Sequence, residues 1–180
     1  MKPKAQHGGA DRLTKNKAHV PHSITASVIP WLRGAATADT VDLGPPHPPK
    51  EEAITAFTHL LLELKRKLVH LRHDYQKHEP EYFAAVDHLN DHQLAGFGPG
   101  DLVSVRVASS AYGVHLFGKV HIPAMPESGP AYIHFRAFIA GAEEPPTLHS
   151  VHTEDKLEAG GGRTYRAIFT RDDELKWFDT

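Results

Sequence analysis

Residues 50–78 read KEEAITAFTHLLLELKRKLVHLRHDYQKH, and their apolar side chains recur at steps of three and four. This spacing places them on one face of an α-helix about eight turns long. Glutamates lie in the first turn and basic residues in the last, which complements the helix dipole. Pro49 suits the start of a helix and Pro80 interrupts its end, so we predict a long amphipathic helix here. Its apolar face consists of Ile54, Phe57, Leu60, Leu61, Leu64, Leu68, Leu71 and Tyr75.

The hydrophobic period changes after this helix. Residues 81–92 keep a helical spacing and predict a second, shorter helix, and AGFGPG at 95–100 then breaks the chain. From there on, apolar and polar residues alternate as in β-strands. Turn-forming residues separate predicted strands at about 101–108, 113–122, 131–140, 147–153, 163–170 and 174–178. Short connections favour antiparallel pairing, so we predict an α+β domain with one long and one short helix packed on an antiparallel sheet of about six strands.

The N-terminal residues 1–47 differ from the rest of the chain. Before residue 20 they carry five lysine or arginine residues against one acid, with no sustained apolar period. Prolines at 45, 46, 48 and 49 favour a stiff, extended linker. We predict a disordered basic arm and Pro-rich linker at 1–47 and a single domain at 48–180. The apolar residues within 24–32 leave open that this segment docks on the domain.

Composition limits the possible functions. The chain has 180 residues, a formal net charge of −2, 15 His and no Cys. The charge argues against a globally basic nucleic-acid binder, although a local basic patch stays possible. Without Cys there is no disulfide scaffold and no thiolate chemistry. We find no apolar run long enough for a membrane span or a secretion signal, so we expect a cytoplasmic or nuclear protein.

Alternation separates two faces of the predicted sheet. One face is apolar, and we expect the long helix to cover it. The other combines cations, imidazoles and aromatic rings: Arg106, His115, Phe117, Lys119, His121, Tyr132, His134, Arg136, Phe138 and Arg166. Three interpretations stay open for this face: ordinary solvent exposure, a homodimer interface, or a groove for an anionic ligand. The clustered positive charges also predict that His115, His121 and His134 are harder to protonate than in the unfolded chain.

The C-terminal sequence resembles the nuclear transport factor 2-like superfamily, which includes the SnoaL-like polyketide cyclases and dehydratases. The resemblance is carried by RTYRAIFTR at 163–171, by the acidic pair at 172–173 and by ELKWFDT at 174–180. It implies a cone of helices against a curved sheet, dimerisation through that sheet, and a pocket inside the cone for a small hydrophobic ligand.

A second resemblance points to the stefin-type cystatins, which wrap a sheet around one long helix. It is carried by YIHFRAF at 132–138 and DELKWF at 173–178. Cystatins inhibit cysteine proteases through a Gln-x-Val-x-Gly hairpin. The nearest string here, HQLAG at 92–96, does not reproduce that spacing.

Acid–base chemistry has one group of candidate residues. His134 lies on a strand face with Tyr132 and Arg136, so an imidazole base and a cation for an enolate or carboxylate would be neighbours. His149 could complete such a site. The pair His88 and His92 has a workable spacing for metal ligands, but close pairs arise by chance in a chain with 15 His. We therefore predict no metal and no cofactor.

The leading functional hypothesis is a binding or scaffold protein that forms a homo-oligomer through its sheet. Its partner-binding residues would be Arg106, His115, Phe117, Lys119, His121 and Arg166. One alternative is a SnoaL-like isomerase, cyclase or dehydratase that uses the acid–base group. A further alternative is a cystatin-like protease inhibitor.

Overall fold

The structure is a computed structural model that describes residues 41–141 and 143–179. These residues belong to one unit, Ala35–Thr180. The predictions for the basic arm, and for docking of residues 24–32 on the domain, lie outside the described residues.

The predicted long helix is confirmed as α1, Glu51–His78. Its first turn holds two glutamates and its last turn Lys77 and His78, as the helix dipole favours. The chain leaves the helix at Glu79, directly before Pro80. In the part of the chain that the structure describes, no helix is both long and apolar enough to cross a membrane.

The predicted short helix over 81–92 is instead two separate turns. A 3-10 helix, η1, spans Pro80–Val86, and a one-turn helix, α2, spans Asp91–Leu94. Asn90 and Gln93 cap α2 reciprocally, so the helix starts afresh there instead of continuing η1. The buried Arg72 of α1 donates to the Leu89 carbonyl at 2.7 Å. This hydrogen bond holds the segment between η1 and α2 against α1.

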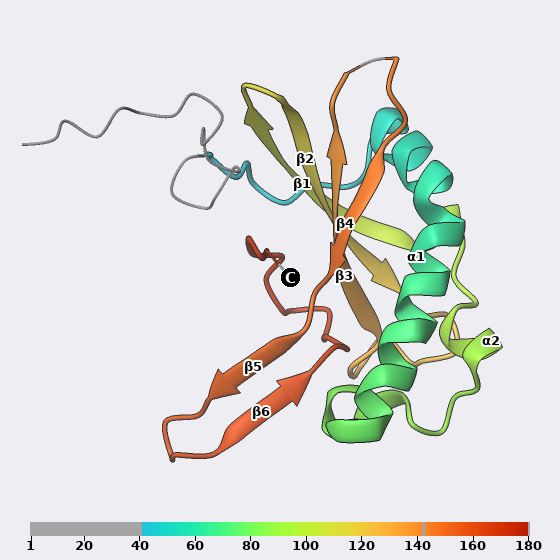
Figure 1. The fold of residues 1–180 in the computed structure, drawn as a ribbon, viewed down its shortest axis with the longest axis vertical. Coiled ribbons are helices and arrows are strands. Elements are labelled where there is room, and N and C mark those ends of the chain that lie inside the picture. Colours follow the sequence, from blue (N-terminus) through green and yellow to red (C-terminus); the bar gives the residue numbers. More distant parts are fainter. Residues whose placement is uncertain (1–40, 142, 180) are drawn as a thin grey trace, which may run out of the picture. The chain divides into compact units, whose positions relative to one another are not determined.

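The main sheet is an antiparallel meander of four strands in the order β1-β2-β3-β4. The strands are β1 Leu102–Ser110, β2 Gly113–His121, β3 Tyr132–Ile139 and β4 Thr147–Val151, which follow a further 3-10 turn, η2, at Pro99–Asp101. Figure 1 shows α1 on one side of this sheet. The α+β class and the antiparallel pairing are therefore confirmed.

The single sheet of about six strands was wrong in detail. Beyond β4 the chain forms a separate two-stranded hairpin of β5, Glu154–Leu157, and β6, Arg163–Arg166. Residues 174–178 are not a strand. Their backbone carbonyls accept hydrogen bonds from side chains of the sheet instead of from another strand, as described below, so period-two alternation there did not signal β-pairing.

The core lies between α1 and the apolar face of the sheet. Phe57 of α1 stacks on Phe135 of β3 with ring centroids 5.5 Å apart. A bulge in β1 lies between Leu102 and Ser104, and Val103 within it is exposed. Burial of each large apolar side chain contributes about 1.5–3 kcal/mol to stability. The fully buried members include Phe57, Leu60, Leu64, Leu68, Leu94, Phe97, Val105, Val120, Ile133 and Phe135.

Residues 43–47 lie along the outer edge of β1. Leu43 pairs with Ala108, and His47 pairs with Val105, both as isolated antiparallel bridges. The backbone N–H of His47 donates to the Val105 carbonyl at 3.0 Å, and the reciprocal bond is 2.9 Å. Part of the predicted linker is therefore paired with the sheet.

Gly118 of β2 is required by the core. A Cβ atom at this position would collide with the ring of Phe135, which is fully buried and stacked on Phe57. We expect Gly118→Ala to lower the free energy of unfolding by about 1–3 kcal/mol in urea denaturation. Gly129→Ala is the control, because a Cβ there meets nothing, and its effect should stay within about 0.5 kcal/mol. Equal midpoints for the two variants would contradict this packing.

Candidate functional site

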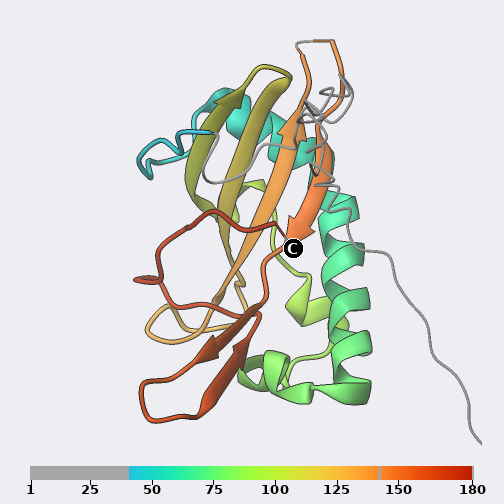
Figure 2. The same ribbon diagram turned by 60° about the vertical axis from the view of Figure 1, so that its left-hand side comes forward.

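The polar face of the sheet is covered by residues 169–179, which we call the C-terminal segment. Figures 1 and 2 show this segment on the side of the sheet opposite α1. Lys119 of β2 donates to the carbonyls of Arg171 and Asp173, at 2.7 and 2.5 Å. Arg136 of β3 donates to the Phe178 carbonyl at 3.0 Å and to Asp179 Oδ1 at 2.7 Å. Lys119, a predicted partner-binding residue, and Arg136, a candidate catalytic residue, thus both donate to main-chain carbonyls of the chain itself.

Arg106 of β1 joins the same arrangement from the edge of the sheet. Its guanidinium donates to the Leu175 carbonyl at 2.9 Å and to the Gly44 carbonyl at 2.6 Å. It also lies 3.3 Å from a Glu174 carboxylate oxygen. Arg106 therefore links the C-terminal segment to the residues that run along β1.

Aromatic rings fill the space between the segment and the sheet. The Arg136 guanidinium lies 4.3 Å from the ring centroid of Trp177 and 5.5 Å from that of Phe117. Phe117 is fully buried, in a small cluster with Leu175 and Phe178. This second cluster lies on the polar face, so both faces of the central strands are covered.

His134 is the most deeply buried ionisable group on this face. Its side chain is only 1% exposed, and its ring stacks on Phe169 with centroids 4.3 Å apart. Neither of its ring nitrogens has a hydrogen-bond partner among the described residues. Burial, followed by the charges of Lys119 and His152, holds the pKa of His134 well below its usual value.

His115 and His149 lie around Arg136 at the other end of the face. Burial first, and the Arg136 charge second, lower the pKa of each imidazole. Arg136 donates to His115 Nδ1 at 3.3 Å, which requires an unprotonated nitrogen there. The predicted direction is therefore confirmed for His115 and His134, although burial, not the clustered cations, is the main cause.

The four candidate catalytic residues form two groups. Tyr132 and His134 lie with Lys119 beneath the start of the C-terminal segment. Arg136 lies with His149 near Asp179 at its end. Burial is also the main cause that raises the pKa of Tyr132. Tyr132, His134 and Arg136 are buried, whereas His149 is exposed and its Nδ1 lies 3.0 Å from the Ser150 hydroxyl oxygen. The structure therefore does not bring the four residues together at one accessible site.

The remaining predicted binding residues are engaged as well. His121 Nε2 donates to the Met125 carbonyl at 3.1 Å. Arg166 donates to Glu154 at 2.6 Å and to Asp173 at 3.0 Å. Sequence reasoning missed Asp173 and Asp179 as partners of this face. The signal in the sequence was the group of acidic residues at 172–174 and 179, because the cation-rich face of the central strands carries no carboxylate of its own.

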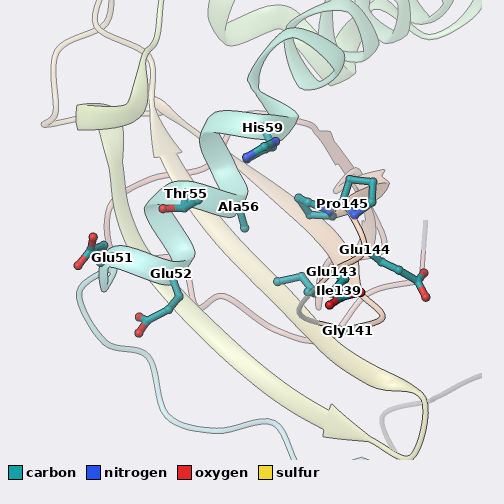
Figure 3. A pocket seen from close by; sticks show the side chains of 11 residues that line it. Glu51, Glu52, Thr55, Ala56, His59, Ile139, Gly141, Glu143, Glu144 and Pro145 are labelled. Atoms are coloured by element: carbon teal, nitrogen blue, oxygen red, sulfur yellow. The ribbon is translucent and has the colours of Figure 1, made fainter.

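An open pocket lies elsewhere, between the first turns of α1 and the connection that follows β3. Its volume is about 630 Å³. Figure 3 shows glutamates of α1 on one side of it and glutamates of the connection on the other. Its lining consists of Glu51, Glu52, Thr55, Ala56, His59, Ile139, Gly141, Glu143, Glu144, Pro145 and Pro146. The pocket combines four carboxylates with an apolar surface, and none of its described lining residues is a Lys or Arg.

A smaller cavity of about 330 Å³ adjoins this pocket, because Glu52 and Ile139 line both. Its apolar wall comes from Ala53, Val107, Val114, Leu116 and Ile139, and His47, Lys50 and Glu52 complete it. Sequence analysis did not identify either cavity. Among the residues that the structure describes, no cluster of three or more His, Asp or Glu side chains is placed to hold a metal ion.

Comparisons with protein-family models, curated proteins and solved structures found no match to this chain. The nuclear transport factor 2-like and cystatin resemblances therefore stay predictions.

Arg136 provides a test of the covered face. We expect Arg136→Met to lower the free energy of unfolding by about 1.5–3 kcal/mol, because the buried Phe178 carbonyl loses a charged donor. The control is Arg163→Met in the β5–β6 hairpin. Its side chain, 57% exposed, also pairs with a carboxylate at 2.7 Å, so its loss should cost less than about 1 kcal/mol. Urea denaturation measures both, and equal losses would contradict a structural role for the segment.

Proposed function

We propose that this chain is a non-enzymatic binding protein, and that the open pocket beside α1 holds a lysine- or arginine-containing segment of another protein. The observation that carries the proposal is the lining of the pocket. Four glutamates meet an apolar surface there, without a Lys or Arg among the lining residues. Such a surface attracts cations.

The apolar part of the pocket favours a Lys or Arg side chain over a simple cation. Both side chains carry a charged group on a long aliphatic stem, which packs against apolar surface while the charge stays near water. Ala56, Ile139, Pro145 and Pro146 provide that surface, and the glutamates lie around it (Figure 3). Glu51 and Glu52 also interact with the N-terminal end of the α1 dipole. The positive end of a helix dipole partly offsets the charge of Glu51 and Glu52, but Glu143 and Glu144 do not lie at a helix start. We therefore expect Glu143 and Glu144 to contribute most to the attraction of a cationic ligand.

The same geometry gives less support to an enzyme. The SnoaL-like alternative needs a ligand cavity between the long helix and the sheet. Fully buried side chains, among them Phe57, Leu64 and Phe135, fill the centre of that region. The smaller cavity of about 330 Å³ does lie between the start of α1 and the strands, but none of the four candidate catalytic residues is among its described lining residues. The proposed acid–base group lies beneath the C-terminal segment instead.

The finer predictions stand as proposals beside this one. They are a cone-like arrangement of nuclear transport factor 2-like type, a homo-oligomer, and a small hydrophobic or anionic ligand. A dimer formed through the polar face would first have to displace residues 169–179, because Lys119 and Arg136 already bind them. We therefore place the binding site at the pocket.

Fluorescence anisotropy with a labelled hexalysine peptide tests the proposed site. We expect binding that weakens at high salt, and no binding of an uncharged Gly-Ser hexapeptide. The double variant Glu143→Gln/Glu144→Gln should raise Kd about tenfold, because two exposed charge pairs are lost.

The matched control is Glu63→Gln/Glu81→Gln. It removes the same charge from exposed glutamates that do not line the pocket. Its Kd should change less than about twofold. If the two double variants weaken binding equally, or if hexalysine does not bind, the proposed site is wrong.

A further inference from the structure

We infer that the C-terminal segment is a proton-sensitive strap, which stays closed while the imidazole of His134 beneath it is neutral and leaves the sheet when that imidazole is protonated. This inference is independent of the pocket beside α1, since the strap covers the opposite face of the sheet.

The environment of His134 suits only a neutral ring. The ring is stacked on Phe169 with an angle of 6° between the two planes, so the first residue of the strap covers it. Protonation would give the ring two N–H donors. Both nitrogens are buried, and neither has an acceptor among the described residues. A charge would therefore be created away from bulk solvent and without a hydrogen-bond partner among the described residues, which is costly.

The charged and titratable neighbours come from every element around the ring. They are Lys119 of β2, Tyr132 of β3, His152 after β4, Arg166 of β6 and Asp173 of the strap. Asp173 is the one carboxylate among these neighbours, and its oxygens already accept hydrogen bonds from other groups. It accepts hydrogen bonds from the Thr170 backbone at 2.7 Å, the Thr170 hydroxyl at 2.8 Å and Arg166 at 3.0 Å. Lys119 and Arg166 oppose a further positive charge.

The direction of the pH effect follows from proton linkage. The pKa of His134 is lower in the closed state than in a solvated one. The open state therefore binds more protons as the pH falls. The closed strap has its full stability above the ordinary imidazole pKa of about 6.5 and loses it as the pH falls below that value. His115 and His149 shift in the same direction near the other end of the strap.

The strap can separate from the rest of the domain. Its backbone pairs with the sheet at one isolated bridge, between Phe169 and Tyr132. Its other contacts with the strands are to side chains, chiefly Lys119, Arg136 and Arg106. The larger core between α1 and the sheet lies on the opposite face. Opening therefore exposes Phe117 and these cations without requiring α1 to unfold.

Amide hydrogen exchange of the full chain, corrected for the intrinsic effect of pH, tests the strap. The measurement follows the amides of Phe169 and Thr170, which donate to the Tyr132 carbonyl and to Asp173, and compares them with β2 and β3 at about pH 7.5 and about pH 5.5. We expect protection of the strap to fall by up to about tenfold at the lower pH, which is the limit for one imidazole with an ordinary pKa of about 6.5 in the open state. Protection of the two strands should hold.

His134→Phe keeps a ring against Phe169 and removes the titrating group. The loss of hydrogen-exchange protection at the lower pH should therefore be much smaller in this variant than in the wild type. His78→Phe, at an exposed site on α1, should lose protection as the wild type does. If His134→Phe does not fold, His134→Gln serves the same comparison. The inference is overturned if the wild-type strap keeps its protection, if the His134 and His78 variants behave alike, or if β2 and β3 lose protection in parallel with the strap.

Discussion

A buried ammonium or guanidinium group is costly unless hydrogen bonds replace the water that it has lost, and the central strands of this sheet bury one of each. Lys119 is 7% exposed and Arg136 is 2% exposed. Carbonyl oxygens of residues 171, 173 and 178 meet these charges. Removal of the C-terminal segment would leave both charged groups hydrogen-bonded only to water and would expose Phe117. The need to give Lys119 and Arg136 hydrogen-bond acceptors thus determines the path of the C-terminal segment.

The sequence predicted those parts of the fold that rest on local periodicity. The helical spacing of α1 and the alternation in β2 and β3 each arise because one face of the element packs against the core. The hydrophobic period alone was therefore sufficient to predict these elements. The alternation also identified an unusual face with Lys119 and Arg136 on it. It could not say what covers that face, because a strand pattern carries no information about a segment distant in sequence.

The errors have physical causes of the same kind. In residues 174–178 the polar Glu174 and Lys176 alternate with Leu175 and Trp177 in the sequence, which resembles a strand. The buried residues are Leu175 and Phe178, which are three positions apart, so the segment does not follow the period of two of a strand. The second predicted helix failed because a capping box at Asn90 started a new turn. The acidic pocket could not be predicted, since it joins the start of α1 to a connection that follows β3. The hypotheses of binding and of proton sensitivity consequently rest on tertiary contacts.

The pairing of residues 43–47 with β1 has a consequence for association between molecules. An uncovered edge strand offers unpaired N–H and C=O groups to any passing strand and favours aggregation. Here the edge of β1 is occupied by a segment that contains Pro45 and Pro46 and continues into Pro48 and Pro49. Proline has no N–H to donate, so the outer side of this segment is a poor template for a further strand. The sequence suggested that these proline residues form a spacer. In the structure they also protect one edge of the sheet from pairing with a strand of another molecule.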